Sequence, residues 1–168
     1  MRSVKIKEVI DALERFAPLP LQESYDNAGL QVGLTEVDVS GALLCLDVTE
    51  AVVDEAVRNG CNLIVAHHPL IFRKLAQITD ATYVQRTVIK AIQNNITIVA
   101  MHTNMDAAKG GVNHKIAEKL GLTSIRTFGN IKRVLSPITS ELVEGAEGLM
   151  GDFTTPIAAD DLIIMLKK

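Results

Sequence analysis

Two adjacent histidines, His67 and His68, have the clearest chemical potential in this sequence. They follow an apolar run that begins near Leu63, and Pro69 ends that run. Neutral imidazole is a good ligand for zinc, iron, nickel and related metals. The pair has two interpretations: the side chains bind metal, or one is a core histidine that donates a hydrogen bond to a backbone carbonyl.

The spacing of this pair restricts how it could hold an ion. Adjacent residues of an extended strand point to opposite faces, so His67 and His68 do not readily chelate one ion unless the backbone bends. Pro69 favours an extended backbone at His68, which keeps the side chains apart. If both bind metal, one histidine per ion is the simpler geometry.

A second candidate group follows the apolar run at residues 96–101. His102 comes directly after it, and Asp106 follows four residues later. An aspartate there can curl back over the sheet edge, to bridge two divalent ions or to orient a ligand histidine. The alternative is that Asp106 caps the next helix. Two parallel strands with such residues at equivalent ends resemble the plan of two-metal hydrolases.

The segments around the first histidines predict strand–helix–strand order. Residues 41–48 are an apolar run expected to form a buried strand, Thr49 is a good helix N-cap, and Gly60 closes that helix. The strand before His67 follows at once, as in a βαβ unit. Open α/β sheets bind ligands at the carboxyl ends of their strands, so the histidines should lie at that edge.

Apolar residues recur at helical spacing in four further segments. The first has Ser3 as its expected cap and ends before Pro18. Another strand is expected at residues 96–102. The expected helices cover residues 3–17, 81–94, 110–120 and 158–168.

Loops and short strands are expected in the remaining segments. Residues 24–33 read as a polar loop with a short strand at 30–32, and its Asp26-Asn27 pair is typical of a turn. A short strand is expected near residues 131–138. Residues 147–151 predict a glycine-rich turn.

Length and composition fit a single α/β domain over residues 1–168, with a mixed or mostly parallel sheet and helices on its faces. The net charge of -3 argues against a nucleic-acid binder, which normally carries a basic face. Cys45 and Cys61 are expected to be buried, reduced thiols, and His114 a surface residue. No apolar stretch reaches the ~18 residues of a membrane span and no signal peptide is apparent, so the expected location is the cytoplasm.

Several segments of this chain occur together in one protein family. They are residues 25–33 (YDNAGLQVG), 65–72 (VAHHPLIF), 102–106 (HTNMD), 110–113 (GGVN) and 147–151 (EGLMG). In this order they resemble the NGG-interacting-factor-like family, also called the GTP cyclohydrolase 1 type 2 homologue family. The resemblance covers essentially the whole chain, and the segment from His67 to Phe72 is its most specific part.

The resemblance implies one lobe of a two-lobed α/β fold and a dinuclear centre of divalent ions. Its metal ligands map onto His67, His68 and Asp106, and it places His102 beside the ligands. Such ligands admit zinc, manganese, iron, nickel or cobalt. Several members form a ring-shaped homohexamer, so the resemblance also implies a homo-oligomer and, by the family's name, a protein partner.

The chain resembles only the N-terminal half of the family plan. The other half supplies a further histidine and glutamate to the metals, and this sequence ends before such a motif. We therefore expect a piece of a longer protein, or a chain that pairs with another copy or another polypeptide. Two functions follow: a metal-dependent hydrolase acting on a small polar molecule, or a non-catalytic, metal-binding regulatory and interaction module.

Overall fold

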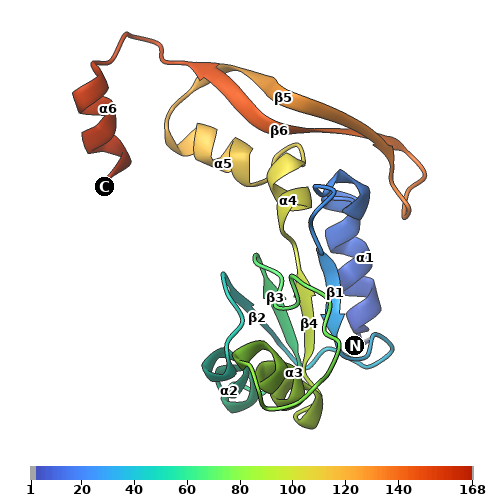
Figure 1. Cartoon of the computed structure of the whole chain (residues 1–168). Helices are drawn as coiled ribbons and strands as arrows, with labels where there is room; N and C mark the ends of the chain where they lie inside the picture. Colours follow the sequence, from blue (N-terminus) through green and yellow to red (C-terminus); the bar gives the residue numbers. More distant parts are fainter. Residues whose placement is uncertain (1–2, 168) are drawn as a thin grey trace.

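The computed structural model describes residues 3–167 and consists of an open sheet with its helices and a long hairpin above it (Figure 1). The helices are α1 (Ile6–Phe16), α2 (Glu50–Arg58), α3 (Tyr83–Gln93), α4 (Thr103–Ala107), α5 (Val112–Lys119) and α6 (Ala159–Leu166), with a 3-10 turn η1 at Leu19–Leu21. The strands are β1 (Gly29–Val32), β2 (Ala42–Cys45), β3 (Leu63–Ala66), β4 (Thr97–Ala100), β5 (Thr123–Leu135) and β6 (Leu142–Asp152).

The four-stranded sheet has the order β1-β4-β3-β2. Strands β2, β3 and β4 are parallel, and β1 pairs antiparallel with β4. Ala66 of β3 lies opposite Cys45 of β2 and Ala100 of β4, so the three parallel strands end level with one another. The prediction of a mixed, mostly parallel sheet flanked by helices is confirmed. The predicted site residues come after the carboxyl ends of β3 and β4 in this sheet.

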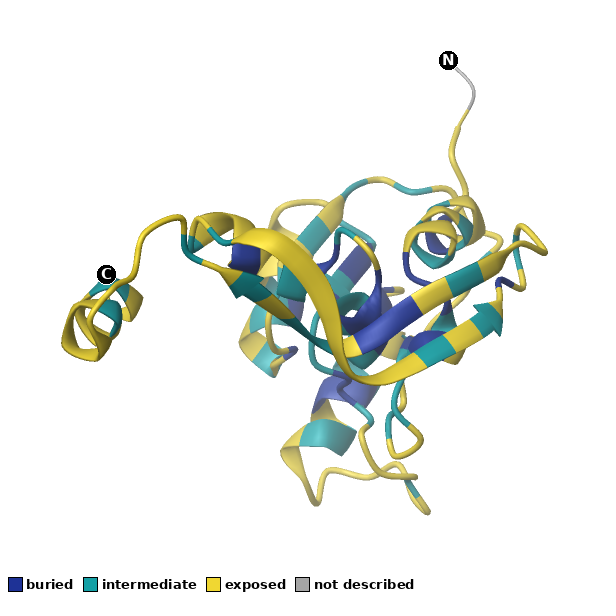
Figure 2. Ribbon diagram, turned by 90° about the horizontal axis from the view of Figure 1, so that it is seen from above, coloured by how far each residue is buried: buried dark blue, intermediate teal, exposed yellow. Residues whose placement is uncertain are grey.

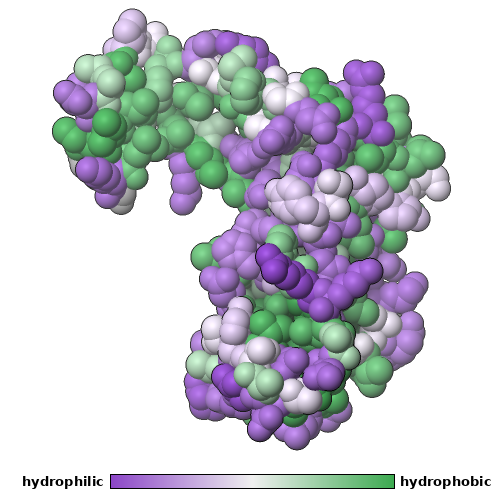
Figure 3. Space-filling model, viewed as in Figure 1, coloured by the Kyte–Doolittle hydropathy of each residue, from purple (hydrophilic) through white to green (hydrophobic). Residues whose placement is uncertain are grey.

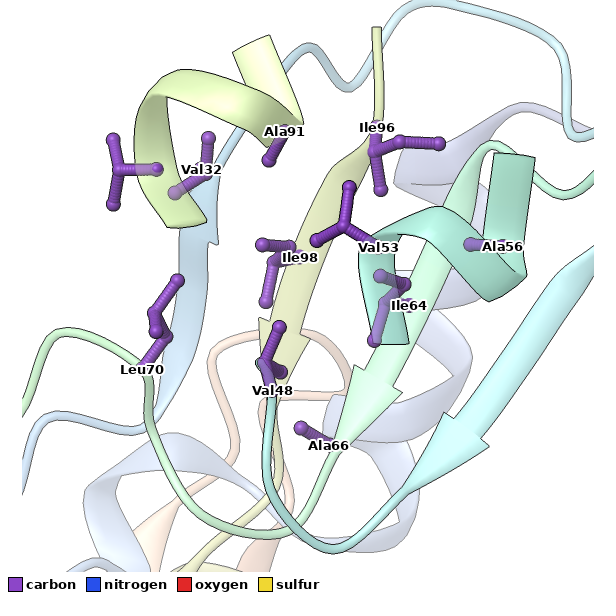
Figure 4. Packing of buried hydrophobic residues seen from close by; sticks show 11 residues of the cluster. Val32, Val48, Val53, Ala56, Ile64, Ala66, Leu70, Ala91, Ile96 and Ile98 are labelled. Atoms are coloured by element: carbon purple, nitrogen blue, oxygen red, sulfur yellow. The ribbon is translucent and has the colours of Figure 1, made fainter. Parts of the chain in front are cut away.

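Alternate residues of the central strands enter two separate apolar clusters. Ile64 and Ile98 face one side, where α2 and α3 cover the sheet; Figure 4 shows Val53 and Ala56 of α2 packed over them. Leu63 and Val99 face the other side, where α1 and η1 cover it. Strands β3 and β4 are therefore apolar on both faces, as parallel strands covered on both sides require.

The signals for α2 act as the sequence predicts. The Thr49 hydroxyl accepts a hydrogen bond from the Val52 N–H, which satisfies one of the free donors at the helix start. Gly60 follows the helix with φ +67°, a conformation that L side chains rarely adopt. These two residues set the length of α2 and return the chain to the sheet.

Two expectations about the first 50 residues are wrong. Helix α1 begins at Ile6 rather than after Ser3, and the carboxylate of Glu8 accepts a hydrogen bond from the Lys5 N–H at its start. Strand β2 is not buried: it lies at the sheet edge, and Leu44 is 79% exposed. Hydrophobic composition alone did not distinguish an edge strand from a central one.

The segment after α5 differs most from its prediction. In place of one short strand and a glycine-rich turn, the chain forms the long antiparallel hairpin β5–β6. Residues 147–151 lie within β6, and the chain reverses instead near Ser136, whose backbone N–H binds the Glu141 carbonyl. Glycines inside β6 gave the sequence the appearance of a turn.

Lys132 of β5 fastens this hairpin to the rest of the chain. Its ammonium, with a side chain only 16% exposed, donates to the carbonyls of Leu21 (3.1 Å) and Gln22 (2.7 Å) and to the Glu23 carboxylate (2.7 Å). Hydrogen bonds from a charged donor are the strong ones. The clamp holds the hairpin against the loop that leads to Asp26.

Replacing Lys132 with methionine should lower the free energy of unfolding by about 1–3 kcal/mol, because the partly buried acceptors lose their donor. Urea denaturation would measure the loss. Arg133→Met is the matched control: the Arg133 side chain is 70% exposed and forms an ion pair with Glu144 across the hairpin. An equal loss of unfolding free energy in both variants would show that the hydrogen bonds of Lys132 stabilise the fold no more than the exposed ion pair of Arg133 does.

Much of the distal part of the molecule is exposed. Figure 2 shows the hairpin largely exposed, and its buried residues are Ser136 at the turn and Gly145 and Ala146 of β6. Every residue of α6 is at least partly exposed, and Ile163, Ile164 and Leu166 are more than 48% exposed. In Figure 3 apolar side chains gather at this end of the molecule. Cys45 and Cys61 are free thiols, only partly buried.

Within residues 3–167, no helix combines the length and the apolar character that crossing a bilayer would need.

Candidate metal centre

Three histidines meet at the carboxyl edge of the parallel strands. His67 and His68 follow the end of β3, and His102 follows β4 by two residues. One ring nitrogen from each lies within 4.8 Å of the other two. The ring centroids are 5.0 Å apart for His67–His68 and 5.2 Å for His67–His102. This cluster supports the prediction of a site at that edge.

The backbone bends immediately after β3, which brings the adjacent histidines together. In a parallel ladder consecutive N–H groups point to opposite neighbours. Here the N–H groups of both His67 and His68 bind β2 and its extension, at the carbonyls of Cys45 (3.1 Å) and Leu46 (2.9 Å). The expectation that Pro69 keeps the two side chains apart is therefore wrong.

Each of the three imidazoles has its Nδ1 atom bound to an oxygen. His67 Nδ1 lies 2.9 Å from the Met101 carbonyl, His68 Nδ1 2.7 Å from Asp47, and His102 Nδ1 2.8 Å from Asp26. A carbonyl or carboxylate only accepts, so each Nδ1 carries a proton, and in the neutral form of each ring Nε2 keeps a lone pair. Metal-binding histidines are oriented in this way.

His67 combines features of both interpretations of the histidine pair, the core histidine and the metal ligand. It donates to a backbone carbonyl, as a core histidine would, but its side chain is 25% exposed. Its Nε2 lies 3.8 Å from Oδ1 of Asp106. The carbonyl therefore fixes the ring while the opposite nitrogen stays available at the cluster.

Asp106 reaches the cluster from the short helix α4. It does not cap α5, because the N-cap residue of that helix is Gly111. Gly111 is also closely packed: a Cβ there would lie 1.9 Å from the Met105 carbonyl oxygen. The turn after α4 therefore has no room for a side chain at that position, and it leaves Asp106 over the strand ends.

Asp26 is the residue that sequence reasoning missed. The sequence predicts a turn at this position, but the fully buried carboxylate of Asp26 accepts hydrogen bonds from His102 Nδ1, from the Thr103 N–H at 3.1 Å and from the Thr103 hydroxyl. Burial alone would raise the pKa of this carboxyl, but the hydrogen bonds from Thr103 and His102 outweigh it and hold the pKa below its usual value. Asp26 thus stays ionised and orients His102.

Replacing Asp26 with asparagine should lower zinc affinity by about 10–100-fold, because His102 loses the carboxylate that fixes its tautomer. Calorimetric titration of the metal-free protein with zinc would measure this. Asp38→Asn is the control, since Asp38 is exposed and pairs with Lys5 far from the histidines. Unchanged zinc affinity in Asp26→Asn would show that the orientation of His102 does not contribute to zinc binding.

The available donors suit a divalent transition metal. Three imidazole nitrogens and one nearby carboxylate are the types of ligand that zinc, iron, nickel, cobalt and manganese accept. The three histidines lie close enough together to share one ion, whereas the sequence favoured one of the adjacent histidines for each ion. The number of ions stays a prediction.

The fourth histidine, His114, lies outside this cluster in α5. It is only partly exposed, and its Nδ1 atom is buried without a hydrogen-bond partner among the described residues. The expectation of an ordinary surface residue is therefore wrong. It lines a cavity beneath the hairpin together with Lys109 and Arg126.

Comparison with known proteins identifies relatives over most of the chain. The chain is 42% identical over 119 residues to the "GTP cyclohydrolase 1 type 2 homolog" of Clostridium acetobutylicum, covering 71% of the chain and 44% of the relative. It is 37% identical over 165 residues to the protein of the same name from Clostridium perfringens, covering 98% and 60%. The chain thus spans about half the length of these relatives.

Solved structures give the same result for the fold. A Bacillus cereus protein related to NIF3 superposes with a TM-score of 0.73 at 41% identity, over 79% of this chain and 37% of that one. Reduced HcgD from Methanocaldococcus jannaschii superposes with a TM-score of 0.79 at 25% identity, over 99% and 60%. The family model for Duf34/NIF3 (NGG1p interacting factor 3) matches residues 4–168, and the chain belongs to this family.

Proposed function

We propose that this chain binds divalent metal through His67, His68 and Asp106, with His102 beside them, as part of a metal-dependent hydrolase for a small polar molecule. The observation that carries the proposal is the arrangement of the three imidazoles. Each has its Nδ1 engaged by an oxygen, and one ring nitrogen of each lies within 4.8 Å of the other two. The names of the curated relatives, which are homologues of a cyclohydrolase, agree with this class.

The protein residues would contribute position and charge. The Met101 carbonyl, Asp47 and Asp26 accept from Nδ1 of the three rings, which orients the rings and, in their neutral form, leaves Nε2 free to bind a metal. Asp106 would add a negative charge that offsets the charge of a cation. A bound divalent ion supplies Lewis acidity, which polarises an oxygen of substrate or water. The expected dinuclear centre and the cytoplasmic location belong to this proposal.

Metal analysis tests the proposal directly. The protein, purified and then reconstituted with zinc, manganese, iron, nickel or cobalt, should retain at least one of these metals after dialysis. Failure to retain any of them would overturn the proposal. A variant with His67→Ala and Asp106→Ala should keep its fold, as judged by circular dichroism, and should lose both metal and any turnover.

The exposed apolar surface of the hairpin and α6 favours a second candidate function, a regulatory or interaction module. Phe128, Leu135 and Leu142 of the hairpin are at least 58% exposed, and clustered exposed apolar residues commonly mark interaction sites. Its partner would be another copy, as in the expected homohexamer, or another protein, rather than a membrane or a nucleic acid. Loss of assembly without loss of turnover in Phe128→Ser would favour this function.

A further inference from the structure

A continuous series of hydrogen bonds joins the β5–β6 hairpin to the histidine cluster. It begins where the Lys132 ammonium binds the Glu23 carboxylate and the two backbone carbonyls before it. The Glu23 N–H then donates to the Thr103 hydroxyl at 2.9 Å. That hydroxyl donates to Asp26, and the same carboxylate accepts from His102 Nδ1. The series thus runs from a strand of the hairpin to one of the three imidazoles.

The chemistry of the donors fixes the direction of each bond near the site. The Glu23 N–H can only donate, so the Thr103 oxygen accepts from it and the single hydroxyl proton is left for Asp26. Oδ2 of Asp26 accepts from this hydroxyl and from the Thr103 N–H, whereas Oδ1 accepts from His102. Thr103 therefore sets the rotation of the carboxylate that orients the His102 ring.

The charged members of the series are largely shielded from water. The side chain of Asp26 is fully buried, and those of Lys132 and Glu23 are 16% and 25% exposed. Salt and water screen partly buried charge pairs much less than exposed ones. Moving the loop at residues 21–26 would therefore break several charge-assisted hydrogen bonds, and the loop is held in one position relative to the histidines.

The hairpin also lies against the helix that carries Asp106. Gly145 of β6 forms an isolated backbone bridge with Ala108, just after α4. A Cβ at Gly145 would lie 2.8 Å from the carbonyl oxygen of Ala107, so the two backbones approach closely there. The hairpin thus contacts both of the segments that bring Asp26 and Asp106 to the histidines.

We infer that Lys132 is a positioning residue of the metal centre. By fastening the hairpin to the loop at residues 21–26, it fixes Asp26 through Glu23 and Thr103 and so sets the orientation of His102. This inference rests on the proposed function, because it concerns the same metal centre. It adds a determinant of metal affinity that lies in the hairpin. Because coupling between two sites is reciprocal, bound metal should in turn stabilise the docked hairpin.

Calorimetric titration of the metal-free protein with zinc provides the test. Lys132→Met should weaken zinc binding about 3–10-fold, which lies within the range for substitutions along a network of coupled contacts. Thr103→Val removes the hydroxyl nearer the site and should weaken zinc binding about tenfold. Thr103→Ser keeps the hydroxyl and should restore most of the affinity.

Two controls separate positioning from a loss of stability. Ile98→Ala removes a fully buried core side chain and should destabilise the fold at least as much as Lys132→Met does. In conditions where urea denaturation shows each variant to be folded, Ile98→Ala and Arg133→Met should bind zinc like the original chain. Zinc affinity that falls in Ile98→Ala as far as in Lys132→Met would overturn the inference.

A double variant tests whether the effect passes through Asp26. Residues that act through one another have non-additive effects, so Lys132→Met should cost little further zinc affinity in a chain that already carries Asp26→Asn. A full additional loss would overturn this route. Hydrogen exchange tests reciprocity: zinc should slow exchange of the β5–β6 amides in the original chain, and much less in Lys132→Met.

The titration of the original chain separates this inference from the proposed function. If zinc binds the original chain and Lys132→Met alike, the positioning role is overturned and the metal centre stands. If the original chain binds no zinc, the positioning role is also overturned, and metal analysis with the other divalent ions then decides the proposed function.

Discussion

Replacing His67 and His68 together with alanine is expected to lower zinc affinity by more than about 100-fold, because loss of an outer partner alone typically costs 10–100-fold. Two of the three convergent imidazoles disappear in this variant. Calorimetric titration of the metal-free protein with zinc, with metal content measured after dialysis, would determine the loss.

The control for this variant is His114→Ala. His114 is the one histidine of the chain that is not a member of the cluster, and it lies in α5. It should bind zinc like the original protein. Equal loss of affinity in both variants, or no loss in either, would show that zinc binds elsewhere. Circular dichroism should show a preserved fold, since His67 and His68 are partly exposed.

Replacing Ile98 with alanine is expected to destabilise the fold by about 2–4 kcal/mol, the range for removing a large aliphatic side chain from a packed core. Ile98 is fully buried in the central strand β4, where its side chain packs with those of β3 and α2 (Figure 4). Urea denaturation would give the change in the free energy of unfolding.

Leu44→Ala is the control for this substitution. The chemistry of the two changes is similar, but Leu44 is 79% exposed on the edge strand β2. Its change should stay within about 0.5 kcal/mol of zero, as for most surface substitutions. A comparable loss in both variants would mean that another molecule or further protein covers β2 under the conditions of the measurement.

The parallel part of the fold was predictable because its signals are local. Thr49 and Gly60 mark the ends of α2, and the apolar runs of β3 and β4 are buried on both faces. The hairpin was not predictable in the same way. Most of β5 is exposed and β6 contains glycines, so neither strand shows the clear alternation of apolar and polar residues that identifies a strand.

The site was predictable in its position but not in its internal geometry. The order of the strands placed His67, His68 and His102 at one edge, because parallel strands end on the same side. The bend after β3 depends on consecutive hydrogen bonds to β2 and its extension, which periodicity does not reveal. The role of Asp26 depends on a contact with His102 across 76 positions of sequence.

Among the strands of residues 3–167, none pairs with the outer side of β2, where Leu44 and Leu46 are exposed. Free N–H and C=O groups along an apolar edge are a template onto which another extended chain can add as a fifth strand. The template accepts any suitable strand, including β2 of a second molecule. Storage of this chain at high concentration should therefore favour slow, edge-to-edge self-association, and a charged residue at position 44 should prevent it.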